Sequence, residues 1–132
     1  RYLKERRPFK VMALGTDAAV ATALGNDYGY EHVFARQVEA FAETNGIFLA
    51  ISTSGNSPNV VNAIKKAKHL CMYTIALTGN GGGKLKDIAH VLIDVPSTST
   101  PRIQEAHQCI FHYICQQVEA ALANSSRETE RE

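Results

Sequence analysis

The chain has 132 residues, of which 45% are hydrophobic and 20% are charged, a composition typical of one soluble globular domain. Its formal net charge of +1 gives no global field that would attract nucleic acid or an anionic membrane. No apolar stretch approaches the roughly 20 residues that span a bilayer, and no signal peptide is visible. Three cysteines without CxxC spacing indicate neither a disulfide framework nor a zinc finger, and they fit reduced thiols in a cytoplasmic protein: Cys71, Cys109 and Cys115.

Strand and helix patterns alternate along the chain. Residues 10–14 predict a short strand, and Asp17 can cap a helix of small residues over 18–24. Residues 25–30 contain four turn-favouring residues, Gly25, Asn26, Asp27 and Gly29, and predict a loop. The next helix is expected over 31–43. One face of that helix is apolar and consists of Val33, Phe34, Val38 and Phe41.

The second half of the chain repeats this alternation. Residues 47–51 form a continuous apolar run, typical of a strand that is covered on both faces. A helix over 58–69 follows, with a buried stripe of Val60, Val61, Ile64 and Ala67. The remaining expected elements are a strand over 73–77, a loop over 79–83, a short helix over 85–89, a strand over 91–95 and a helix over 101–123.

This order predicts an α/β domain over residues 1–123, with a mainly parallel sheet between helices on both faces, a three-layer αβα sandwich. Residues 124–132 form a polar tail that is expected to fray. In such sheets, ligands bind beyond the carboxyl ends of the strands. The loops that begin at Gly15, Ser52, Thr78 and Pro96 are therefore the ones in which a site is expected.

The loop before the helix over 58–69 contains the strongest local signal. Ser57 is a good N-cap, and Pro58 suits the first helical position, where a missing N–H costs nothing. The loop therefore brings unpaired backbone N–H groups and the positive end of a helix dipole together. Gly55 allows a close backbone approach. Neutral hydroxyl donors converge there from Ser52, Thr53, Ser54 and Ser57.

This donor set suits a phosphate ester. The loop has no lysine of the GxxxxGK[ST] type, so a monophosphate on a small molecule fits better than ATP, and no nucleotide cofactor is expected. The residues by themselves fit a capped helix after a polar turn equally well.

Several motifs in register resemble the bacterial phosphoheptose isomerases of the sugar isomerase (SIS) domain family. Residues 50–57 resemble the phosphate loop of that family. The other matching motifs are Gly25 to Tyr30, Ala76 to Gly79 with Gly82 and Gly83, and Arg102 to Glu105 with His107 and His112. The resemblance covers the chain up to about Ala120 and implies a Rossmann-like fold.

The resemblance implies an aldose–ketose isomerase, a cytoplasmic homotetramer that converts sedoheptulose 7-phosphate to D-glycero-D-manno-heptose 7-phosphate in lipopolysaccharide biosynthesis. It implies that the phosphate is held by Ser52, Thr53, Ser54 and Ser57. Asn26 and Asp27 match positions that line the sugar site. Gln104 matches a residue that contacts the substrate and, in some members, a zinc ion. His112 matches a histidine assigned to acid–base catalysis or to zinc.

The chemistry gives these roles a reason. Ketose–aldose exchange needs a base near the carbon that loses a proton and a donor to the oxygen that becomes negative. A histidine serves either role near neutral pH, and a zinc ion could polarise the carbonyl instead. On one helix, Gln104 and His112 are separated by about 12 Å along the axis, so joint binding of one ion requires their side chains to converge.

Part of the family pattern is missing. The chain opens without Met at Arg1, and a polar run leads directly into an apolar segment, so we expect an upstream segment in the natural protein. The resemblance places there the N-terminal helices, a first strand, a Gly-rich loop with another serine, and a His and a catalytic Glu. This polypeptide alone is therefore expected to be inactive. Pro101 replaces an acidic residue of some members but suits the start of a helix.

Other polar residues also have ordinary explanations. Asp27 is also a common turn residue, and His112 could be a partly buried helix histidine. His107 is either an alternative ligand or an interface residue. The segment 78–83 is either a ligand cradle or a plain loop. Surface positions are expected for His32, His69 and His90. A broad apolar face on the last helix favours oligomerisation and consists of Cys109, Ile110, Tyr113, Cys115 and Val118.

Two non-catalytic functions compete on the same fold. One relative of these enzymes is a tetrameric factor that binds the bacterial replication initiator, and a sensor of sugar phosphates would need only the phosphate loop. The resemblance favours the enzyme, because the initiator-binding relative lacks a histidine at the position of His112.

Overall fold

The computed structural model describes residues 1–125 and builds them around three parallel strands in the order β1-β2-β3. The strands are β1 (Ile47–Ser52), β2 (Tyr73–Thr78) and β3 (Val91–Asp94). Helix α3 (Pro58–His69) connects β1 to β2, and a 3-10 turn, η2 (Gly83–Leu85), lies between β2 and β3. The parallel sheet predicted from the alternating pattern is confirmed.

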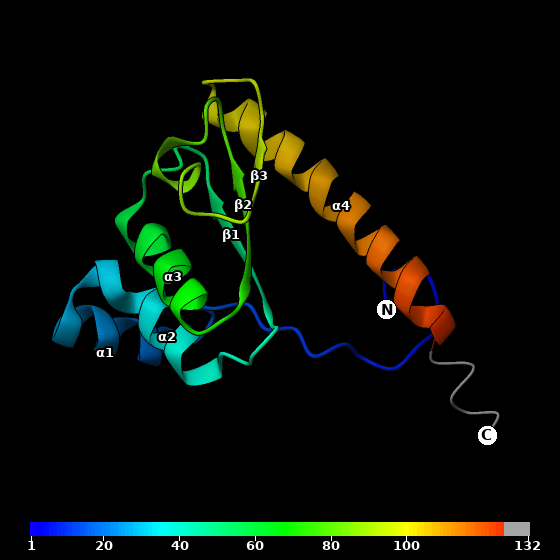
Figure 1. Ribbon diagram of the computed structural model, residues 1–132, viewed down its shortest axis with the longest axis horizontal. Helices are drawn as coiled ribbons and strands as arrows, with labels where there is room; N and C mark the ends of the chain where they lie inside the picture. The colour runs from blue at the N-terminus through cyan, green and yellow to red at the C-terminus, as the bar shows by residue number, and fades with distance from the viewer. Residues whose placement is uncertain (126–132) are drawn as a thin grey trace.

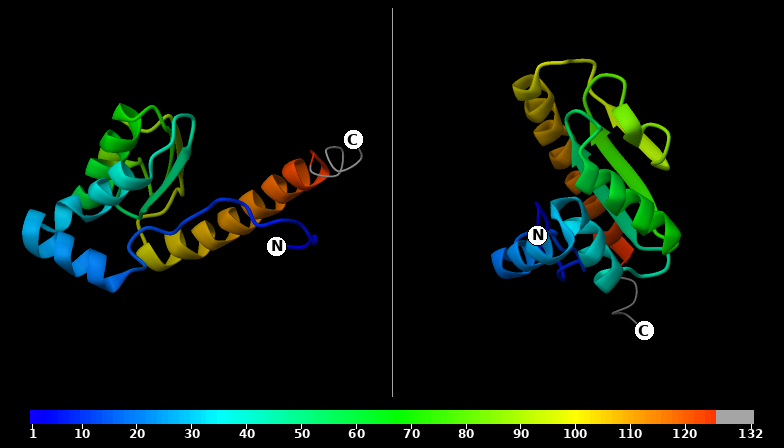
Figure 2. Two further views of the ribbon diagram at one scale, coloured as in Figure 1. Left: turned by 90° about the horizontal axis from the view of Figure 1, so that it is seen from below. Right: turned by 90° about the vertical axis from the view of Figure 1, so that its left-hand side faces the viewer.

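Helices lie on both sides of this sheet (Figure 1). Helix α3 packs on one face, and α2 (Val33–Phe41) packs beside α3. Helix α1 (Ala18–Tyr28) and the turn η1 (Tyr30–His32) precede α2. Helix α4 (Thr100–Ser125) begins near the carboxyl ends of the strands and extends beyond the sheet on the other side (Figures 1 and 2). The layers agree with the predicted α/β sandwich.

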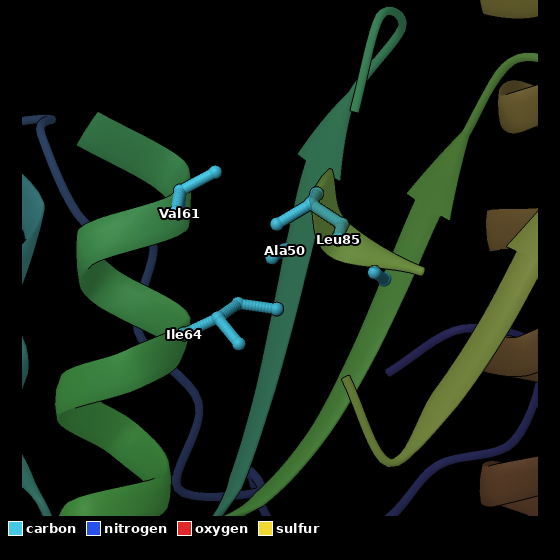
Figure 3. Close-up of a cluster of buried hydrophobic side chains, with 5 residues drawn as sticks. Ala50, Val61, Ile64 and Leu85 are labelled. Atoms are coloured by element: carbon cyan, nitrogen blue, oxygen red, sulfur yellow. The ribbon is translucent and has the colours of Figure 1, made fainter. Parts of the chain in front are cut away.

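The core lies between α3 and the sheet (Figure 3). Ala50 and Ala76 are register partners on neighbouring strands, and their small side chains allow α3 to approach closely. Ile64 is fully buried against them. The remaining members of this cluster are Val61 and Leu85, with Phe48, Val60, Ile88, Ala89 and Leu92 around them. This packing holds the loop before α3 at the carboxyl edge of the sheet.

Local sequence explains where the helices begin and end. The Asp17 carboxylate accepts hydrogen bonds from the N–H groups of Ala19 and Val20 at the start of α1. Pro58 occupies the first turn of α3, as predicted. Three basic residues, Lys66, Lys68 and His69, complement the negative end of the α3 dipole. The observed bounds of α3, α4 and the three strands agree with the predicted ranges to within two residues.

The predicted strand over 10–14 is wrong. A strand needs a hydrogen-bonded neighbour, and the three-stranded sheet gives this segment none. Residues 11–13 have no regular structure, and Val11 is 86% exposed. Before this segment, residues 2–6 run alongside the second half of α4 (Figure 2).

The predicted boundaries around α1 and α2 also need correction. The expected loop over 25–30 is largely helical, because α1 continues to Tyr28 and ends only at Gly29, whose φ of 88° requires the freedom of glycine. The helix expected over 31–43 is shorter, so Phe41 ends α2 and is exposed rather than buried. The helix expected over 85–89 is the single 3-10 turn η2.

The second face of β1 is open, which corrects the expectation that both faces are covered. Ile47, Leu49 and Ile51 alternate with the core residues of β1 and are between 37% and 66% exposed. Helix α4 covers only the carboxyl end of this face, where Leu77 and Ile103 are buried. Within the described residues, much of the second apolar face of β1 is therefore exposed.

No helix in the part of the chain that the structure describes is both long and apolar enough to cross a membrane. The polar tail predicted over 124–132 begins inside α4, and residues 126–132 lie outside the described residues.

We predict that Ile64→Ala lowers the free energy of unfolding by about 2–5 kcal/mol, because it leaves a cavity between α3 and the sheet. Ile51→Ala, on the open face of β1, is the matched control and should cost about 1 kcal/mol or less. Urea denaturation of both variants measures the difference. Equal losses would contradict this assignment of the core.

Candidate functional site

The loop of residues 52–57 connects the end of β1 to the start of α3. Ser52 is buried at the end of β1, and Ser57 is the N-cap of α3. Their hydroxyls share a hydrogen bond with 2.9 Å between the Oγ atoms, although Ser57 makes no side-chain cap bond. The predicted convergence of hydroxyls is therefore present for this pair.

A second loop, residues 79–85, is hydrogen-bonded to the loop of residues 52–57. The N–H of Gly79 donates to the carbonyl of Thr53 at 2.9 Å, and the N–H of Leu85 donates to the carbonyl of Gly55 at 3.1 Å. Gly55 has a φ of 65°, and a Cβ at this position would lie 2.0 Å from the carbonyl oxygen of Gly82. The close contact between the two backbones thus requires a glycine at position 55. The hydrogen bonds from the second loop hold the first loop in place.

Donors remain available in the loop of residues 52–57. The backbone N–H groups of Thr53, Ser54 and Ser57 find no acceptor within the described residues. They lie at the start of α3, where the helix dipole is positive. Because no carboxylate occupies the loop, this arrangement can bind a phosphate or another small anion through neutral donors.

Thr78 is a polar residue beside this loop, and it opens the segment 78–83 that the sequence analysis considered as a ligand cradle. It is the register partner of Ser52, so both side chains lie on the same face of the sheet. Its Oγ1 is buried and is the one buried side-chain atom without a hydrogen-bond partner within the described residues. The sequence signal for it was its position directly after the strand expected over 73–77, at the start of a loop in which a site was expected.

Asn26 and Asp27 lie in the last turn of α1, and their side chains bond to each other at 3.0 Å. The turn that follows is attached to α3, because the Asn62 amide donates to the carbonyl of Glu31 at 3.0 Å. In the described part of the chain, no hydrogen bond joins Asn26 or Asp27 to the loop of residues 52–57. Their predicted role in the sugar site stays a prediction.

Helix α4 carries the remaining predicted residues. His107 is buried, and its Nε2 lies 3.1 Å from the carbonyl oxygen of Thr78, which attaches α4 to the end of β2. Gln104 and His112 are exposed on either side of this attachment. The ring of His112 contacts Tyr2 in an edge arrangement, with 6.0 Å between ring centroids. The structure does not bring Gln104 and His112 into contact.

The described residues do not by themselves contain a complete set of ligands for a zinc ion. None of the described His, Cys, Asp and Glu side chains form a group of three that could hold a metal. Gln104 and His112 are eight residues apart on a continuous helix, a rise of about 12 Å. A zinc ion on these two residues would therefore need further ligands from beyond the described residues.

A shallow hollow of about 280 Å³ lies at the opposite, amino end of the strands. It is lined by Asn45, Lys68, Cys71, Met72, Tyr73 and His90. Its Tyr73 and His90 rings stack on each other, and Nδ1 of His90 accepts a hydrogen bond from the N–H of Thr74. The side chains of the hollow are thus occupied by contacts that stabilise the strand ends. The loop at the carboxyl edge is the candidate site, because it has N–H donors without a partner within the described residues.

Together, the parallel sheet and the helix that follows β1 define an α/β domain with a donor-rich loop at its strand ends. A family model described as SIS domain matches residues 3–79 of the chain. The chain belongs to the SIS domain family.

Curated relatives agree with this assignment. The phosphoheptose isomerase of Rhodospirillum rubrum is 48% identical over 124 residues, which cover 94% of this chain and 66% of the relative. That of Aquifex aeolicus is 49% identical over 126 residues, which cover 96% of this chain and 66% of the relative. The chain thus spans slightly less than two thirds of the length of these relatives.

Solved structures give the same result for the fold. A phosphoheptose isomerase from Francisella tularensis superposes with a TM-score of 0.82 at 41% identity, covering 84% of this chain and 60% of that chain. One from Neisseria gonorrhoeae gives 0.77 at 45% identity, covering 78% and 59%. The resemblance noted from the sequence motifs is confirmed.

We predict that Gly55→Ala reduces the affinity for inorganic phosphate at least tenfold, because the new Cβ would push the loop of residues 52–57 away from Gly82. Gly81→Ala is a matched control, since Gly81 also has a positive φ of 77° but has open space around it. Isothermal titration of both variants with phosphate measures the difference. An equal loss in both would mean that backbone strain, rather than the contact between the loops, matters.

Proposed function

We propose that this protein is an aldose–ketose isomerase that converts sedoheptulose 7-phosphate to D-glycero-D-manno-heptose 7-phosphate. The observation that carries the proposal is the loop of residues 52–57, which offers hydroxyls and unpaired N–H groups at the start of α3. The identity of 48–49% to proteins named phosphoheptose isomerase supports this substrate over other sugar phosphates.

The proposed binding mode follows from the donors. Ser52, Thr53, Ser54 and Ser57 hold the phosphate at C7, which leaves the reacting end of the sugar, C1 and C2, several ångströms away. Asn26, Asp27 and Gln104 bind hydroxyls of the sugar in this proposal. In this proposal, groups from outside the described residues complete the site.

The reaction moves hydrogen between two carbons. A base removes a proton from C1 of the ketose while an acid protonates the C2 oxygen, which gives a cis-enediol. A proton then returns to C2 and the C1 hydroxyl loses its proton, which gives the aldehyde at C1 and a hydroxyl at C2. Atoms and charge balance without a cofactor.

His112 is one member of the acid–base pair in this proposal. An imidazole titrates near neutral pH and can donate to or accept from the C1 and C2 oxygens. The second member is a carboxylate outside this chain, which the family resemblance suggests is a glutamate upstream of Arg1.

The cellular setting is also part of the proposal. The cysteines are exposed free thiols, which fits the reducing cytoplasm. The open face of β1 and the exposed Tyr113 and Val118 on α4 fit a homotetramer that buries them. The product would supply heptose for lipopolysaccharide.

We predict that His112→Gln lowers kcat of the complete gene product on sedoheptulose 7-phosphate by roughly 10²–10⁴-fold, because it removes a proton-transfer group. His69→Gln, an exposed histidine at the end of α3, is the matched control and should retain full activity. Assays with and without a chelator test whether a metal contributes. A folded protein that binds phosphate but shows no turnover would overturn the enzyme and leave a binding or sensing protein.

A further inference from the structure

One buried carboxylate joins the first residues of the chain to the second half of α4. Glu119 accepts hydrogen bonds from the backbone N–H groups of Tyr2, Leu3 and Lys4, at 2.5–2.8 Å. It also accepts one from Nε of Arg6 at 2.9 Å. Four donors from a stretch of five residues thus converge on a single side chain.

This carboxylate is a built site rather than a surface ion pair. The side chain of Glu119 is 3% exposed and that of Arg6 is 12% exposed. The Arg6 guanidinium also stacks 3.8 Å from the centroid of the Phe9 ring, which fixes the donor. The clamp, meaning Glu119 with residues 2–6, therefore holds an extended segment that has no regular secondary structure of its own.

The clamp keeps its charge over the working pH range. Burial by itself raises the pKa of the Glu119 carboxyl, but the N–H groups of Tyr2, Leu3 and Lys4 and the Arg6 side chain lower it, to about 2 overall. The folded pKa lies below the ordinary value of 4.5, so the clamp contributes fully above that pH and weakens as the pH falls towards 2. Near neutral pH, where histidines titrate, Glu119 is a carboxylate.

The same clamp reaches the candidate catalytic histidine. His112 precedes Glu119 by seven residues on α4, so the two lie on nearly the same face, two turns apart. The main chain of Tyr2 is bound to Glu119, and its ring contacts the ring of His112. An edge-to-face contact of this kind favours a particular orientation of both rings.

We infer that Glu119 is a positioning residue for His112, acting through Tyr2: the carboxylate fixes residues 2–6 along α4, and the Tyr2 ring then holds the His112 imidazole in one orientation. The inference rests on the proposed function of His112 in proton transfer. It also gives a function to the buried carboxylate of Glu119, which the proposed reaction does not itself use.

The first test reads the His112 ring directly, by NMR of the complete gene product with labelled histidine. Glu119→Gln should shift the His112 ring resonances and should abolish the cross-peaks between the Tyr2 and His112 rings. Glu105→Gln makes the same charge change at an exposed position of α4 and should alter neither. Unchanged His112 resonances in Glu119→Gln would overturn the inference.

The second test separates positioning from folding. Tyr2→Ala removes the ring but leaves the backbone donors of Glu119 in place, whereas Tyr2→Phe keeps the ring. We predict that Tyr2→Ala and Glu119→Gln lower kcat for the sugar phosphate roughly tenfold to a hundredfold with little change in KM, and that Tyr2→Phe restores kcat.

The outcomes are distinct. Wild-type kcat in Tyr2→Ala, together with unchanged His112 resonances, would overturn the inference while leaving the proposed function intact. A wild-type protein without isomerase activity would contradict the proposed function, and the His112 resonances would still decide whether Glu119 and Tyr2 orient the ring.

Discussion

Two loops meet at the carboxyl edge of the sheet, and the candidate site depends on their contact. Residues 52–57 and 79–85 are joined through backbone groups, and Gly55 lies so close to Gly82 that no Cβ fits between them. The contact fixes the directions of the loop's N–H groups before any ligand arrives. A site that is ordered in advance loses less conformational entropy on binding, which favours affinity for a small anion.

Local signals in the sequence were sufficient for the parts of the molecule that this contact organises. Ser57 and Pro58 mark the start of α3, and the apolar runs that became β1 and β2 have the length of strands. The donor-rich loop between them follows from these two boundaries. The position of this loop could therefore be predicted from residues alone, whereas its assignment to phosphate came from the family resemblance. The contact with Gly82 depends on a segment 27 residues further along.

The features that sequence reasoning missed depend on distant partners. Residues 10–14 have the composition of a strand, but only the presence of a neighbouring strand decides whether an apolar run pairs. Asn26 favours turns, yet the Asp17 cap and the alanines before it keep α1 helical to Tyr28. The site residues on α4 were identified by resemblance, whereas the buried contact of His107 with the carbonyl of Thr78 depends on a partner 29 residues away.

The clamp at Glu119 also constrains how the molecule assembles. It joins residues 117 positions apart, almost the full length of the described chain, whereas β1, α3 and β2 are neighbours in sequence. Contacts that close long loops carry a larger entropic cost and are rewarded only after local structure exists. The sheet and α3 should therefore form first, and the chain should fasten its first residues to α4 as a late step in folding.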